Sequence, residues 1–138
     1  MSEANEPMTM QPGRVSWNEL VANNTKAAAD FYGKLFGWKA TPYVPQGLPA
    51  GTPPYTVFRM KVNDERGVGG MMQPPKPVTE SFWLPYVVVG NVDKSLKKAI
   101  KLGAKECVPV TSVGEVGRIA VVQDPRGAMI GLHEFPKG

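Results

Sequence analysis

The sequence predicts an α+β fold in which one βαβββ module is used twice. With 15 glycines and 14 prolines, the 138 residues are too rich in turn formers for a helical bundle and are typical of a sheet protein. The order strand, helix, strand, strand, strand then occurs twice, with a displacement of 67 residues from Asn24 to Asn91 and of 66 from Gly37 to Gly103. Each module would place its helix on one face of a curved sheet. We therefore expect the two free faces to enclose a cup for a small molecule.

The first module begins with a strand, because side chains alternate over Val15–Val21 and place Trp17 and Glu19 on the same face. Asn24 is a suitable N-cap for the helix that follows, and Gly37 is suitable to end it. The apolar residues of this helix recur at helical spacing and should form its buried face: Ala28, Phe31, Tyr32 and Leu35. Further strands are expected at 38–44, 55–62 and 68–73, with a loop rich in proline and glycine at 45–54.

The second module repeats this order, beginning with a strand at 83–89. Asn91 should begin its helix and Gly103 should end it. Its apolar residues again share one face: Val92, Leu96, Ala99 and Ile100. Three more strands are expected at 105–110, 118–123 and 128–135. The lysines between 94 and 105 should form a solvated face, since no aromatic residues alternate with them as base stacking would require.

Composition excludes several classes of protein. A single cysteine, Cys107, rules out a disulfide framework and a Cys-rich zinc module, and we expect it to be buried. A single histidine rules out a multi-His metal site within one chain. The formal net charge of +4 is below that of a typical nucleic-acid binder, and no apolar run approaches the ~20 residues that span a bilayer. We therefore expect neither nucleic acid nor membrane as a partner.

Residues 1–13 are polar and contain two prolines, so they are expected to form a disordered tail. They carry no hydrophobic segment of the kind found in secretory signals, and we expect a cytoplasmic protein. A single domain should then span 14–138, with its two modules at about 14–73 and 80–136.

Several motifs in this order resemble the vicinal oxygen chelate superfamily, which includes glyoxalases, bleomycin-resistance proteins and extradiol dioxygenases. The motifs are WNEL at 17–20, ADFYGKLFGW at 29–38, WLPYVVVGNVD at 83–93 and GRIAVVQDPRGA at 117–128. The resemblance covers about residues 14–136. It implies the glyoxalase/bleomycin resistance/dihydroxybiphenyl dioxygenase fold, in which two βαβββ modules form an incomplete barrel. It implies a fold more strongly than an activity, because these motifs are structural.

Catalytic members of that superfamily hold a divalent metal with His, Gln or Glu side chains on the strands facing the cup. The resemblance places the first ligand at Trp17, the ligand of the second module near Leu84, and the closing carboxylate at Gly131. A further ligand would fall within 69–72, which reads Gly-Gly-Met-Met. None of these side chains suits such a cation. We therefore expect no metal and no other cofactor, with His133 and Glu134 as the nearest residues that could form an unconventional site.

Two residues are candidates for acid–base chemistry. Glu19 could act as a general base or anchor a polar ligand, and it could equally be paired with an arginine or a backbone N–H. His133 falls on the same face of its strand as Gly131 and could work with Glu19, or it could simply be hydrogen-bonded within the core. Apolar, aromatic and small residues are expected to line the cup: Trp17, Phe58, Met60, Met71, Met72, Trp83, Tyr86, Met129 and Gly131.

Two functions follow from these residues. The first is a glyoxalase/bleomycin-resistance-like protein without the usual metal ligands, which binds a small apolar or aromatic molecule in the cup. Bleomycin itself is disfavoured, because it is cationic and the chain is basic. The second is an enzyme of the lyase or isomerase type, using Glu19 and His133 or a divalent metal at an unplaced site. The resemblance also implies a homodimer, and an open curved sheet has edges that a second copy could cover.

Overall fold

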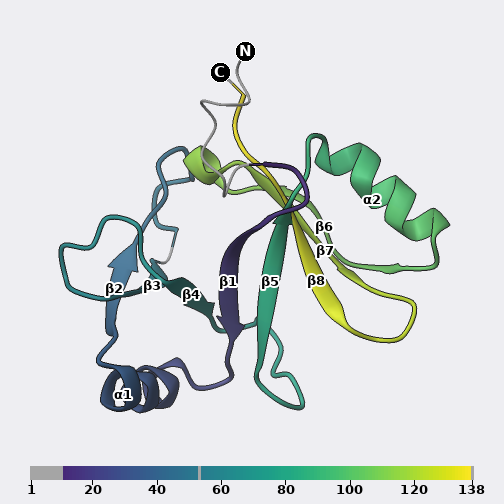
Figure 1. The fold of residues 1–138 in the computed structure, drawn as a ribbon. Helices are drawn as coiled ribbons and strands as arrows, with labels where there is room; N and C mark the ends of the chain where they lie inside the picture. Colours follow the sequence, from purple (N-terminus) through teal and green to yellow (C-terminus); the bar gives the residue numbers. More distant parts are fainter. Residues whose placement is uncertain (1–10, 53, 138) are drawn as a thin grey trace. The chain divides into compact units, whose positions relative to one another are not determined.

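The computed structural model describes residues 11–52 and 54–137, which divide into two compact units. The N-terminal unit consists of residues 17–44 and 49–84, and the C-terminal unit of residues 45–48, 85–137 and the described residues before 17. Each unit carries most of one of the two expected βαβββ modules (Figure 1), so the predicted α+β fold class is confirmed. Most of the expected N-terminal tail lies outside the described residues. Among those that are described, no helix combines the length and apolar character needed to cross a membrane.

The elements of the first module are β1 (Val15–Val21), α1 (Thr25–Phe36), β2 (Lys39–Tyr43), β3 (Tyr55–Arg59) and β4 (Gly69–Met72). The elements of the second are β5 (Phe82–Val88), α2 (Val92–Lys101), β6 (Lys105–Ser112), β7 (Arg118–Gln123) and β8 (Met129–Glu134). A short 3₁₀ helix, η3 (Gly114–Val116), precedes β7 and was not expected from the sequence.

The strands of the N-terminal unit lie in the order β2-β3-β4-β1, with β1 parallel to β4 and the other pairs antiparallel. Alternate residues along each strand face opposite sides of this sheet. One face packs against α1 through a buried core of Leu20, Ala22, Phe58 and Met71. We call the opposite face of this sheet the free face. A row of paired residues crosses it: Thr41 lies opposite Val57, Val57 opposite Gly70, and Gly70 opposite Glu19.

Helix α1 has the expected ends but only part of the expected buried face. The Asn24 side chain accepts the N–H of Ala27 at 2.9 Å, and Gly37 ends the helix in the left-handed conformation at φ 78°. Ala28 and Tyr32 pack against the core as predicted, together with Ala29, which was not predicted. Phe31 and Leu35 are each 58% exposed, so their predicted burial was wrong.

The third strand is shorter than predicted, because the chain leaves the sheet after Arg59. The carboxylate of Asp64 accepts the backbone N–H of Met60 at 3.1 Å and that of Arg66 at 3.2 Å. These bonds hold residues 60–66 in a loop. Met60 therefore follows the strand rather than belonging to it, and it is 59% exposed.

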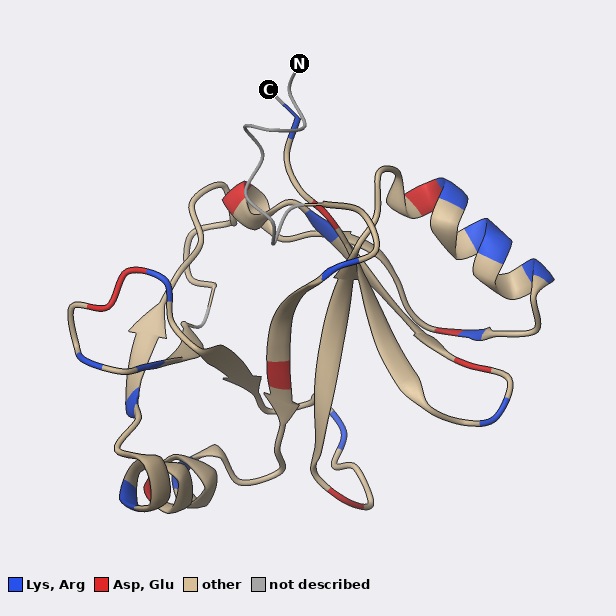
Figure 2. Ribbon diagram, viewed as in Figure 1, with Lys and Arg blue, Asp and Glu red and all other residues tan. Residues whose placement is uncertain are grey.

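The strands of the C-terminal unit lie in the order β5-β8-β7-β6, with β5 parallel to β8. Helix α2 covers one face through Val92 and Leu96, which pack on Ala120 and Val122. The lysines of α2 are exposed, as predicted, and Figure 2 colours their positions along the helix in blue. Ile100 is 47% exposed and lies outside this core.

The expected burial of Cys107 was wrong, since the residue is exposed. Strand β6 is at the edge of the C-terminal unit's sheet, and its pairing with β7 is irregular around this residue, between Glu106 and Val108. An irregular edge strand leaves its side chains partly uncovered.

Two side chains hold the N-terminus of α2. Asn91 accepts the N–H of Lys94 at 3.0 Å, and the carboxylate of Glu134, in β8, accepts the N–H of Val92 at 2.8 Å. Arg118 donates to the same carboxylate at 3.0 Å and to Asp93 at 2.9 Å. The bond from Val92, followed by that from Arg118, lowers the pKa of Glu134 below its usual value.

This arrangement predicts a pH-dependent stability. Because the pKa of Glu134 is lower in the folded state, its contribution is fully present above the ordinary carboxyl pKa and is lost as the pH falls through the folded value. Glu134→Gln should therefore reduce the free energy of unfolding at neutral pH by about 1 kcal/mol. In denaturant titrations the difference from wild type should disappear at acid pH. Glu106→Gln, at an exposed position in β6, is the control. A difference that stays constant with pH would contradict this assignment.

Candidate functional site

The free face of the N-terminal unit carries a chain of three hydrogen-bonded side chains. The indole Nε1 of Trp17 donates to the hydroxyl of Tyr55 at 3.1 Å, and that hydroxyl donates to Oε1 of Glu19 at 2.8 Å. Trp17 and Glu19 come from β1, as predicted, and Tyr55 comes from the start of β3. Glu19 is only 7% exposed. The bond from Tyr55 therefore fixes a buried carboxylate beside two aromatic rings.

Tyr55 takes its position because the residue beneath its ring is a glycine. A Cβ added to Gly70 would lie 1.9 Å from the Tyr55 hydroxyl oxygen and 2.4 Å from two carbons of its ring. No other residue type leaves room for this ring. Sequence reasoning missed Tyr55, although its alternation with Val57 and the Gly-Gly pair on the neighbouring strand were signals that could have identified it.

His133 lies on β8 in the C-terminal unit, where both of its ring nitrogens have partners. The Nε2–H donates to the backbone carbonyl of Val116 at 2.7 Å, and Nδ1 accepts from the hydroxyl of Ser16 at 3.0 Å. Burial lowers the pKa of His133, while the bond to Val116 opposes this shift. A neutral imidazole with Nε2 protonated fits both partners. His133 therefore ties the start of β1 to the 3₁₀ segment, and its nitrogens are already engaged.

The predicted pair of Glu19 and His133 is thus divided between the two units, and each residue is satisfied within its own unit. The other acidic neighbour, Glu134, belongs to the opposite face of β8 from His133, where it holds α2. The alternation of β8 explains why these adjacent residues do not form a joint site.

The space above Gly131 is filled by a side chain of the protein itself. A Cβ at this position would lie 2.3 Å from the ring of Tyr86, which is on the neighbouring strand β5. Gly131 is predicted to line the cup, and this prediction is corrected, because the Tyr86 ring covers it. In each unit, therefore, a tyrosine ring from one strand lies against a glycine of the neighbouring strand.

The remaining predicted lining residues fall into two groups. Phe58, Met71 and Trp83 lie on the side of the sheet that packs with α1, where Phe58 is fully buried and Trp83 donates to Tyr32 at 3.1 Å. This corrects the expected orientation of these three, and we leave them out of the candidate site. Met72 shares the free face with Gly70 by alternation, and Met129 shares that of Gly131 in its own unit. The sulfur of Met129 lies 3.7 Å from that of Cys107.

The residues at the positions that the resemblance gives to metal ligands do not fit a divalent cation. Indole, aliphatic and glycine positions offer no suitable donor atom, and two of the glycines, Gly70 and Gly131, are covered by tyrosine rings. Within residues 11–52 and 54–137, no cluster of three or more His, Cys, Asp or Glu side chains is arranged to hold a metal. We therefore derive no chemical step through a metal.

The close contact at Gly70 predicts a specific loss of stability. Gly70→Ala should lower the free energy of unfolding by about 1–3 kcal/mol, because the new Cβ must displace the Tyr55 ring. The loss should become small in a Tyr55→Ala background, where the ring is absent. Gly90→Ala is a matched control, since nothing lies within 4 Å of the position of its Cβ. Equal losses in the presence and absence of the Tyr55 ring, measured by denaturant unfolding, would contradict the contact.

The chain as a whole is similar to several known proteins. CFP32 from Mycobacterium bovis is 28% identical over 122 residues, and the anthracycline biosynthesis protein DnrV from Streptomyces peucetius is 30% identical over 131 residues. These matches cover 88% and 85% of this chain, which spans about half the length of either relative, 46% and 45%.

A solved structure of methylmalonyl-CoA epimerase from Mycobacterium tuberculosis shares the fold, with a TM-score of 0.55 at 13% identity. The match covers 89% of this chain and 90% of the epimerase. The family model for the Glyoxalase/Bleomycin resistance protein/Dioxygenase superfamily matches residues 14–132. The chain therefore belongs to this superfamily.

Proposed function

We propose that this protein binds a small apolar or aromatic molecule on the free face of the N-terminal unit, without a metal. The observation that carries the proposal is the buried carboxylate of Glu19, joined through Tyr55 to Trp17. Among the described residues, no three His, Cys, Asp or Glu side chains gather to hold a metal there. Val21 and Val57, both buried, and Met72 add apolar surface to the same face.

Each of the three side chains would make a different kind of contact with the ligand. The rings of Trp17 and Tyr55 provide rigid apolar area, which binds an aromatic body at a small cost in conformational entropy. The carboxylate of Glu19 lies beside those rings, and a carboxylate oxygen can accept more than one hydrogen bond, so a ligand with a donor group is favoured over a pure hydrocarbon. The hydrogen bond from Tyr55 keeps the carboxylate oriented before the ligand arrives.

The acid–base alternative is less well supported by the geometry. It requires a second group that can exchange a proton with a substrate, and both nitrogens of His133 are engaged by Ser16 and Val116. The epimerase and dioxygenase structures that share the fold have 13–17% identity to this chain, so their activities carry no argument about its chemistry.

Thermal unfolding in the presence of 2-naphthol, naphthalene, Zn²⁺ or Ni²⁺ tests this proposal. We expect 2-naphthol to raise the melting temperature more than naphthalene, and the metal ions to leave it unchanged. Trp17→Ala should weaken the effect of 2-naphthol about tenfold or more, because it removes both a ring and a hydrogen bond. Protein purified without chelator should contain no stoichiometric metal. Stoichiometric Ni, Zn, Mn or Fe, or stabilisation by neither aromatic compound, would overturn the proposal.

We also propose that the protein forms a homodimer through α1. Phe31 and Leu35 form an apolar stripe on this helix, each 58% exposed, and Phe36 beside them is 56% exposed. Asp30 and Lys34 flank the stripe and form an ion pair at 3.1 Å. Two such helices packed antiparallel about a twofold axis would bring Asp30 of one copy near Lys34 of the other. The surface is therefore complementary to itself, as a twofold interface requires.

Substitutions that reverse the charges of Asp30 and Lys34 test this interface. In sedimentation equilibrium, wild type should have the mass of two chains, and Phe31→Glu should have the mass of one. Asp30→Lys and Lys34→Asp should each weaken the dimer through like-charge contacts, and the double variant should restore it. Ile100→Glu, at an exposed apolar position on α2, is the control and should not change the mass. A wild-type protein that remains monomeric at about 100 μM would refute the interface.

A further inference from the structure

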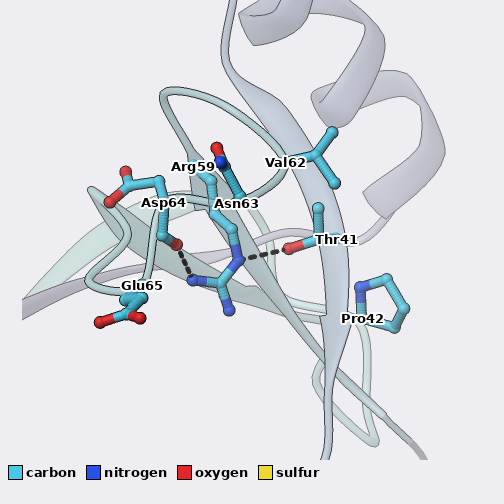
Figure 3. Close-up of a pocket in the computed structure, with 7 residues that line it drawn as sticks. All are labelled: Thr41, Pro42, Arg59, Val62, Asn63, Asp64 and Glu65. Carbon is cyan, nitrogen blue, oxygen red and sulfur yellow. Dashed lines mark hydrogen bonds between the residues drawn. The ribbon is translucent and has the colours of Figure 1, made fainter.

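A pocket of about 520 Å³ lies in the N-terminal unit between β2 and the loop that follows β3 (Figure 3). Thr41 and Pro42 of β2 line it together with Val62, Asp64 and Glu65 of the loop. Arg59, at the end of β3, lies between Glu65 and Pro42 in Figure 3. The pocket shares no residue with the Trp17–Tyr55–Glu19 chain.

Arg59 is fixed by hydrogen bonds on two of its three guanidinium nitrogens. Its Nε donates to the hydroxyl of Thr41 at 2.8 Å, and its Nη1 donates to the backbone carbonyl of Asp64. The Thr41 hydroxyl in turn donates to the carbonyl of Val57 at 3.1 Å. In Figure 3 the third nitrogen points away from both partners and lies between Glu65 and Pro42. Among the described residues, none accepts a hydrogen bond from this Nη2.

The carboxylate of Asp64, which interacts with the charge of Arg59, holds the loop. The carboxylate of Asp64 accepts the backbone N–H groups of Met60 and Arg66. The bond from Met60 lowers the pKa of Asp64, and the nearby charge of Arg59 has a smaller effect in the same direction. These bonds order the loop around the guanidinium of Arg59. The N–H groups of its Nη2 remain available to a ligand.

We infer that this pocket binds a small organic acid, with its carboxylate on Arg59. The N–H groups of Nη2 can donate charge-assisted hydrogen bonds to the oxygens of a carboxylate. Pro42 and Val62, of which Val62 is 74% exposed, give apolar walls for the body of the acid. Glu65 is exposed at the rim, and its charge opposes any anion. A monoanion with an apolar body fits this balance better than inorganic phosphate, which carries more charge and has no apolar part.

Benzoate and its neutral isostere benzamide test this inference by titration of the ¹⁵N-labelled full chain. We expect benzoate to shift the amide signals of residues 60–66 with saturation at millimolar concentration, and benzamide and inorganic phosphate to bind at least tenfold more weakly. Arg59→Met should weaken benzoate binding at least tenfold. Arg66→Met, which changes an exposed arginine of the same loop outside the pocket lining, should have no effect.

A second variant tests the inference even if Arg59→Met loosens the loop. Glu65→Gln leaves the bonds of Arg59 and Asp64 intact, and it should tighten benzoate binding about two- to threefold by removing a repulsive charge. Equal binding of benzoate and benzamide, unchanged or weaker binding in Glu65→Gln, or full binding in Arg59→Met would overturn the inference. These outcomes are independent of 2-naphthol binding, because the two sites have no residue in common.

Discussion

The contact between the Tyr55 ring and the backbone of Gly70 determines what the free face of the N-terminal unit can do. The ring can approach the sheet only because Gly70 has no side chain, and its approach brings the hydroxyl within 2.8 Å of Glu19. Without that hydroxyl, Trp17 would lose the acceptor of its indole N–H, and a carboxylate that is 7% exposed would lose a charge-assisted bond. The absence of a side chain at Gly70 thus allows the contact that positions Trp17, Tyr55 and Glu19.

The C-terminal unit contains the same kind of tyrosine–glycine contact, but the polar groups beside it are different. Tyr86 lies against Gly131 as Tyr55 lies against Gly70, but the polar residue on that face, His133, is bonded to a serine hydroxyl and a backbone carbonyl. Its lowered pKa keeps the imidazole neutral, which suits a structural bond to a carbonyl better than proton exchange. The two modules therefore share their packing and differ in their polar groups. This difference is why we propose binding at the N-terminal unit and a structural role for His133.

Local signals in the sequence predicted the fold well. Asn24 and Gly37 mark the ends of α1 because capping depends on the residue itself. The alternation of β1 correctly put Trp17 and Glu19 on one face. The same rule should have separated Met71 from Met72, because adjacent strand residues face opposite sides.

The other features could not be predicted locally, because they depend on residues of other strands or on tertiary packing. The spacing of Phe31 and Leu35 describes a helix face but does not say whether anything covers it. Tyr55 and Arg59 depend on partners 36 and 18 residues away, Glu19 and Thr41, which no local pattern identifies.

The boundary between the two units does not coincide with the boundary between the two repeats. The C-terminal unit includes Ser16, which bonds to His133, and residues 45–48, where the carbonyl of Gln46 accepts the N–H of Glu115 at 2.8 Å. Its strand β5 also exchanges backbone bonds with Gly13 and Arg14. Dividing the gene between the repeats would therefore deprive the downstream half of segments encoded upstream. If such a chain arose by duplication, its downstream half has since come to depend on segments of the upstream half.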